Sequence, residues 1–71
     1  MLGIIKDITI DGSICIISID DIDTGKTSIV NAETRLFLSA IDDCYGDEWR
    51  NQTIEYDLDS IGCMIGFSPL D

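Results

Sequence analysis

Short runs of β-branched and aromatic residues alternate with turn-forming residues along most of this chain. Residues 2–10 and 13–19 are two isoleucine-rich runs, and Asp11-Gly12 lies between them. An Asp-Gly pair between two such runs is typical of a tight β-hairpin, because both turn positions need positive φ. The pattern therefore predicts that the chain opens with a hairpin whose loop is Asp11-Gly12.

This loop sets the pairing of the two strands, and the pairing sets their faces. Ile8 is expected opposite Cys15, and Ile4 opposite Ile19. We predict a core face made of Ile4, Ile8, Ile10, Cys15, Ile17 and Ile19. The other face still carries Ile5, Ile14 and Ile16, which is more apolar surface than a solvent-facing side needs. Either a closed barrel or sandwich or a second copy of the chain would cover these three side chains, and the second case predicts a homodimer contact through them.

Three further strands are predicted after the first hairpin. The run 26–30 follows the turn Asp23-Thr24-Gly25, which favours a second hairpin with glycine in the left-handed region. The run 53–58 alternates cleanly, with Ile54, Tyr56 and Leu58 pointing inward. The run 61–67 follows a turn at Asp59-Ser60, and Pro69 is expected to end it.

Between the third and fourth runs the apolar period changes from two to that of a helix. One helical stripe contains Leu36, Phe37, Ala40, Ile41 and Cys44. Asn31 is a plausible N-cap, Glu33 falls in the first turn, and Gly46 is suited to close the helix. We predict a helix over about 32–45.

The predicted order β-β-β-α-β-β indicates a single α+β domain over residues 1–71. Five mostly antiparallel strands with a helix after the third resemble, in element order alone, the OB-fold, a small and partly open barrel. A curled antiparallel sheet with the helix packed across one face has the same order. The two differ in whether the first strand pairs with two neighbours.

Charge excludes several partners. Four Lys and Arg residues against 14 Asp and Glu residues give a net charge of −10. Nucleic-acid binding depends on basic side chains that neutralise phosphates, so we expect no direct nucleic-acid contact and no binding to anionic lipid. The same negative field attracts a basic protein surface. No apolar run has the length of a membrane span, and the first residues do not have the pattern of a signal peptide.

The side-chain inventory also limits catalysis and location. The absence of histidine removes imidazole as a general base or metal ligand. The chain has three cysteines, Cys15, Cys44 and Cys63, and no two of them have the close spacing of a metal-binding or redox pair. All three fall on predicted apolar stripes, so we expect their thiols to be buried. We also expect a reducing, cytoplasmic compartment. We predict a protein that is not an enzyme and has no cofactor.

Two short motifs near residue 25 do not match the sites they resemble. Gly25-Lys26-Thr27 lacks the earlier glycine of a phosphate-binding loop and is followed by a predicted strand rather than a helix. Read as a calcium loop, the segment from Asp21 has Ala32 where a bidentate glutamate is needed. The remaining metal candidates are Asp20, Asp21 and Asp23.

A second acidic group lies at the end of the predicted helix. Its carboxylates oppose the helix macrodipole and repel one another, and aromatic residues typical of binding hot spots lie beside them. An alternative is that Trp49 folds over the core and the acidic residues only solvate a loop. The predicted partner-binding residues are Asp42, Asp43, Tyr45, Asp47, Glu48 and Trp49.

These observations favour a non-catalytic acidic module that docks on a basic protein surface. One specific form is an inhibitor or immunity-type protein that covers the nucleic-acid site of a basic partner by imitating phosphate charge. Two alternatives stay open: a small-ligand or divalent-cation-binding β-barrel domain that uses the loop 20–25, and a structural subunit of a homo-oligomer.

Overall fold

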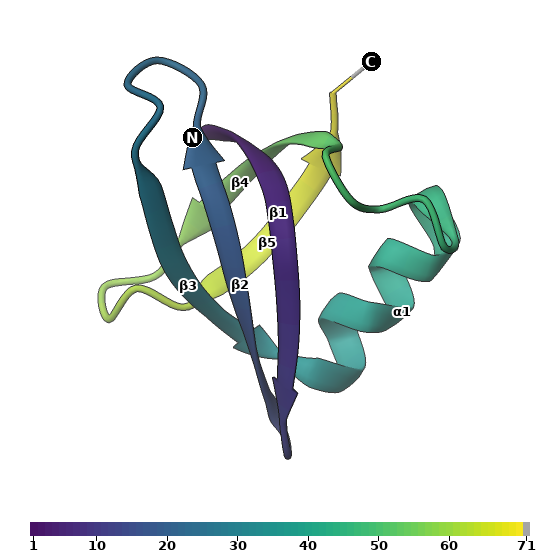
Figure 1. The fold of residues 1–71 in the computed structure, drawn as a ribbon. Helices are drawn as coiled ribbons and strands as arrows, with labels where there is room; N and C mark the ends of the chain where they lie inside the picture. Colours follow the sequence, from purple (N-terminus) through teal and green to yellow (C-terminus); the bar gives the residue numbers. More distant parts are fainter. Residues whose placement is uncertain (71) are drawn as a thin grey trace.

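Every stretch with a two-residue apolar alternation forms a strand, and the stretch with helical spacing forms the single helix (Figure 1). The computed structural model describes residues 1–70. Its elements are β1 (Leu2–Asp11), β2 (Ile14–Asp21), β3 (Thr27–Glu33), α1 (Thr34–Tyr45), β4 (Thr53–Leu58) and β5 (Met64–Pro69). The order β-β-β-α-β-β is therefore confirmed.

All five strands belong to one antiparallel sheet with the order β3-β2-β1-β4-β5. β1 pairs with β2 on one side and with β4 on the other. The sheet curls so that its two edge strands, β3 and β5, approach each other (Figure 1). They meet at a single parallel bridge between Asn31 and Cys63. The predicted α+β curled sheet is confirmed, and the sheet is not closed into a barrel.

The first hairpin forms, but its loop lies one residue later than predicted. Asp11 pairs with Ile14, so the loop is Gly12-Ser13, and Gly12 takes the positive φ of 63°. Ile8 consequently pairs with Ile17 rather than with Cys15. The register between the two strands thus differs from the predicted one by two residues. Because side chains alternate with a period of two, this shift keeps Ile8 and Ile10 opposite residues of the predicted core face.

A register shift between Ile5 and Asp7 exchanges the roles of Ile4 and Ile5. The extra residue in β1 reverses the in-and-out alternation, as β-bulges do. The Ile5 side chain is 0% exposed, whereas Ile4 is half-buried. Ile5 therefore belongs to the core, and its predicted role in a homodimer contact is wrong.

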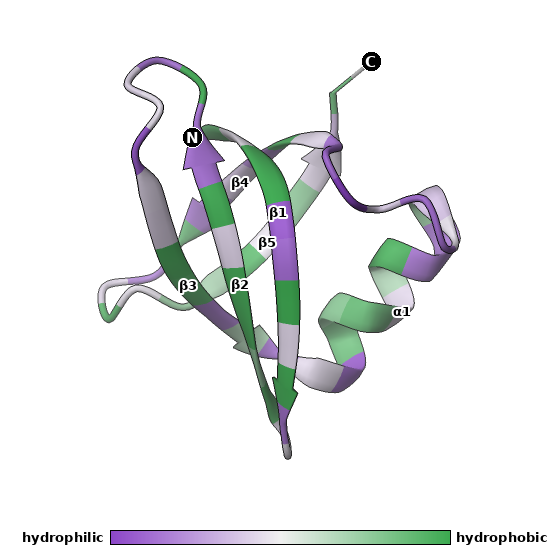
Figure 2. Cartoon of the chain, viewed as in Figure 1, coloured by the Kyte–Doolittle hydropathy of each residue, from purple (hydrophilic) through white to green (hydrophobic). Residues whose placement is uncertain are grey.

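The core fills the concave side of the curled sheet, and α1 covers part of it with Phe37 and Ile41. Figure 2 shows hydrophobic segments alternating with hydrophilic ones along β1 and β2. Three members of the predicted face, Cys15, Ile17 and Ile19, are fully buried, but Ile10 is 58% exposed because it lies near the tip of the hairpin. The buried set is Ile5, Cys15, Ile17, Ile19, Val30, Ala32, Phe37, Ile41, Ile54, Tyr56 and Met64.

The helix begins two residues later than predicted. Asn31 pairs with Ile16 and Glu33 with Ile14, so these residues extend β3 instead of capping or entering the helix. Glu33 occupies the N-cap position without a side-chain capping bond, and the predicted N-cap role of Asn31 is wrong. At the other end the prediction is confirmed: Gly46 has a φ of 60° and donates its N–H to the Asp42 carbonyl at 3.0 Å.

The three cysteines occupy different environments. Cys15 is buried, and burial raises the pKa of its thiol. Cys63 is half-buried and forms the bridge with Asn31 of β3. Cys44 is exposed on α1, so the prediction of a buried thiol is wrong there.

Candidate functional site

Four carboxylates crowd the C-terminal end of α1 and the turn that follows it. We call Asp42, Asp43, Asp47 and Glu48 the acidic cluster. All four residues are exposed, and none of their side chains makes an ion pair or a hydrogen bond to another residue within 1–70. Basic residues are absent from the last turn of the helix. The cluster is thus a concentration of uncompensated negative charge.

The loop after the cluster is fastened to the bulged part of β1. Ile5 donates its N–H to the Gln52 carbonyl at 2.9 Å and accepts one from Asn51 at 2.7 Å. Arg50 donates to the Lys6 carbonyl at 2.6 Å and lies 3.5 Å from the Asp7 carboxylate. These contacts fix the chain at the base of the cluster.

Further bonds close the turn itself. Glu48 donates its N–H to the Tyr45 carbonyl at 3.1 Å, and its own carbonyl accepts from the Gln52 amide at 2.8 Å. Charged side chains on a fixed backbone lose less conformational freedom on binding than those on a mobile loop. The turn therefore holds the backbone of Asp47 and Glu48 in place.

The two aromatic residues predicted beside the cluster contribute to folding. Tyr45 and Trp49 are half-buried and pack against the core. The Arg50 guanidinium lies 4.8 Å from the centre of the Trp49 ring, which is a cation–π contact. Trp49 thus covers the edge of the core, as the alternative interpretation expects. It directly follows Glu48 in the sequence and is still partly exposed. Contact of either aromatic residue with a partner stays a prediction.

Two of the acidic side chains at 20–23, those of Asp20 and Asp21, accept hydrogen bonds within the β2–β3 hairpin. Asp21 Oδ1 accepts the backbone N–H groups of Asp23 and Thr24, and Asp20 Oδ1 accepts the Thr27 hydroxyl at 2.6 Å. The described part of the chain contains no group of three or more side chains that could hold a metal ion. The β2–β3 loop and the acidic cluster lie on opposite sides of the molecule (Figure 1).

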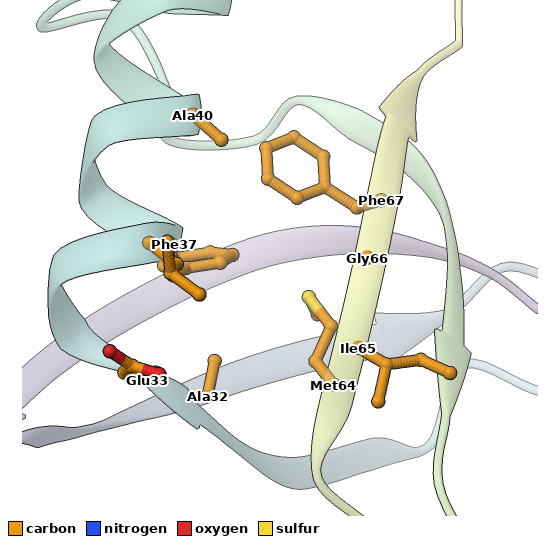
Figure 3. A pocket seen from close by; sticks show the side chains of 9 residues that line it. Ala32, Glu33, Phe37, Ala40, Met64, Ile65, Gly66 and Phe67 are labelled. Atoms are coloured by element: carbon orange, nitrogen blue, oxygen red, sulfur yellow. The ribbon is translucent and has the colours of Figure 1, made fainter.

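The structure also shows a groove that the sequence pattern did not reveal. It lies between α1 and β5 and has a volume of about 460 Å³ (Figure 3). Its lining is apolar except at Glu33. The helical stripe predicted as core includes Leu36 and Ala40, yet Leu36 is 66% exposed in this groove. The lining residues are Ala32, Glu33, Leu36, Phe37, Ala40, Met64, Ile65, Gly66 and Phe67.

The outer face of the sheet retains part of the apolar surface predicted for a homodimer. Ile14 is exposed and Ile16 is half-buried there. Ile29, opposite Ser18 on β3, is 61% exposed on the same face. With Ile5 in the core, this surface is smaller than the sequence pattern indicates.

Comparison with protein-family models, with curated proteins and with solved structures finds no match. Among residues 1–70, no helix has the length and hydrophobicity needed to cross a membrane.

Proposed function

We propose that this protein is a non-catalytic acidic interaction module and that the acidic cluster docks on a basic surface of a partner protein. The observation that carries the proposal is the set of four exposed carboxylates without ion pairs, two at the end of α1 and two on the fixed turn that follows it. Holding them at the negative end of the helix macrodipole costs stability, because a carboxylate there is unfavourable by roughly 0.3–1 kcal/mol. A cationic partner would offset that cost.

The specific form of the proposal is an inhibitor or immunity-type protein that covers a nucleic-acid-binding surface. Such surfaces carry Lys and Arg side chains arranged to neutralise phosphates. A chain with a net charge of −10 and closely spaced carboxylates supplies the charges that those side chains bind. Its attraction acts at long range, so it also speeds encounter with the partner at low salt.

The test compares two variants of equal net charge. One reverses Asp42, Asp43, Asp47 and Glu48 to lysine; the control reverses Asp11, Asp23, Glu55 and Asp57, which are exposed and whose carboxylates make no hydrogen bond or ion pair within the described residues. Four reversals of +2 each bring the net charge from −10 to −2 in both variants.

The wild-type protein and both variants serve as baits in affinity purification from the native host at low salt. We expect a basic partner on the wild-type bait, reduced capture on the control and none on the cluster-reversed bait. The purified partner should bind DNA or RNA, and the wild-type protein should displace that nucleic acid. Equal capture by the two variants would show that net charge alone acts and would remove the acidic cluster from the proposal.

A further inference from the structure

The groove between α1 and β5 has a floor of packed apolar side chains. The rings of Phe37 and Phe67 lie 5.4 Å apart between their centres, and Met64 is buried beside them. Figure 3 shows Phe37 on the helix side and Phe67 and Met64 on the strand side, all directed into the space between the two elements. The volume of about 460 Å³ lies within the range of protein ligand sites.

One wall of this groove is an unpaired strand edge. β5 pairs with β4 through Glu55–Ser68, Tyr56–Phe67 and Asp57–Gly66. Its other edge meets no strand in the described chain beyond the single bridge at Cys63. An edge strand of this kind offers main-chain hydrogen-bonding groups to another extended chain.

The hydrogen-bond phase of β5 shows which groups are available. Leu70 donates its N–H to the Thr53 carbonyl at 3.1 Å, so this pair bonds across the β4–β5 ladder. Bonded and non-bonded pairs alternate in an antiparallel ladder. The N–H and C=O of Phe67 therefore point away from β4, toward the groove.

One acidic residue lines the groove, and a second follows on the helix one turn beyond its lining. Glu33 lines it at the start of the helix, and Asp43 lies one helical turn beyond Ala40 at the other end. Both carboxylates are exposed and neither forms an ion pair within residues 1–70. An apolar floor with a carboxylate near each end complements a segment that is apolar in the middle and basic at its ends.

We propose that the groove binds an extended segment of a partner protein, which adds to the sheet as a sixth strand along the free edge of β5. Its main chain bonds to Phe67, alternate apolar side chains fill the space beside Leu36, and its basic ends face Glu33 and Asp43. The inference rests on the proposed function, because it gives the basic partner a second point of attachment. A second copy of this chain is a poorer occupant, since it brings another net charge of −10.

The test uses the purified protein and a synthetic peptide, acetyl-Lys-Val-Thr-Val-Thr-Val-Lys-amide, followed by amide NMR. We expect saturable shifts of the Phe67, Ile65 and Ala40 amides and slower hydrogen exchange at Phe67. Three control peptides separate the contributions. Two of them are N-methylated at every second amide, in opposite phases; the phase that blocks the main-chain bonds to Phe67 should bind at least roughly tenfold more weakly, a change of about 1.4 kcal/mol, and the other phase should bind like the unmodified peptide. The third has glutamate at both ends, which reverses the charges, and should also bind at least roughly tenfold more weakly.

Two protein variants of matched exposure localise the site. Leu36→Gln removes an apolar wall of the groove, and Ile29→Gln makes the same kind of change on the outer face of β3. Leu36→Gln should weaken peptide binding roughly tenfold, as expected from the loss of a buried leucine contact, while Ile29→Gln should leave it unchanged.

Several outcomes would overturn the inference. Equal binding of the peptides N-methylated in either phase would mean apolar adsorption, and groove shifts that grow with protein concentration alone would identify a second copy as the occupant. Binding of the glutamate-ended peptide at full strength would contradict the charge argument. Because this assay uses a synthetic peptide, its failure would not change the result of the cluster-reversal experiment. Failure of the cluster-reversal experiment would likewise not change the result of the peptide assay.

Discussion

At the scale of single residues, Gly3 is the glycine with the least space for a side chain. A Cβ built there would overlap Ile19 Cγ2 and lie 3.3 Å from Tyr56 Cε1. Gly3→Ala should therefore lower the free energy of unfolding by about 1–3 kcal/mol, the usual cost of overpacking a core. Chemical denaturation measures the change. Gly66→Ala is the control, because nothing lies within 4 Å of its Cβ position, and it should not destabilise the protein. Equal losses in both variants would contradict the steric explanation.

The choice between Ile4 and Ile5 shows what residue patterns leave undetermined. Both are isoleucine in a run where nearly every second position is apolar, so alternation alone favours neither. The bulge that buries Ile5 is held by hydrogen bonds to Asn51 and Gln52, which lie far along the chain. A local pattern does not contain that information, whereas the inward positions of Ile54 and Tyr56 follow from simple alternation.

At the scale of elements, α1 carries an adverse charge at its C-terminal end. Asp43 lies in the last turn, where no basic residue is present. Asp43→Asn should raise the free energy of unfolding by about 0.3–1 kcal/mol, since it removes a carboxylate from the negative end of the macrodipole. Thermal or urea unfolding at low salt measures the effect. Asp57→Asn, an exposed change of equal charge on β4, is the control. An equal gain in the control would attribute the effect to net charge.

The two ends of α1 differ in how far local sequence determines them. Gly46 ends the helix because its own conformation and one local hydrogen bond are sufficient. The start depends on β2, whose pairing with Asn31 and Glu33 keeps those residues extended. Contacts with distant parts of the chain also decide which helical residues line the groove. Leu36 shares a helical stripe with Phe37, and only the curl of the sheet decides that one is exposed and the other buried.

At the scale of the whole molecule, the fold class follows from element order, but the separation of the edge strands does not. β3 and β5 meet at one bridge and then diverge, which leaves the groove beside α1. The sequence places acidic residues at 20–23 and 42–48, and the curl of the sheet sends them to opposite sides (Figure 1). Asp20 and Asp21 of the first group accept hydrogen bonds within their hairpin, whereas no carboxylate of the second group is bonded within the described chain, so the second is the better binding candidate.

Salt should affect the stability of this protein and its proposed association in opposite directions. Among the described residues there is one ion pair, between Arg50 and Asp7, and both side chains are more than half exposed. Added salt therefore weakens the single attractive ion pair only slightly, and it weakens the mutual repulsion of the acidic side chains much more, because the chain has a net charge of −10. Tm should rise as NaCl increases from about 0.01 M to about 0.5 M, where the screening length falls from roughly 30 Å to a few ångströms.

Differential scanning fluorimetry measures Tm across this NaCl series, and titration calorimetry measures affinity for the captured partner under the same conditions. NaCl is preferred to a sulfate salt, because sulfate also strengthens apolar burial. The cluster-reversed variant, with a net charge of −2, should lose most of the rise in Tm. A Tm that stays flat or falls with salt in the wild-type protein would mean that charge repulsion does not limit its stability. The negative charge would then carry no stability cost that a cationic partner could offset.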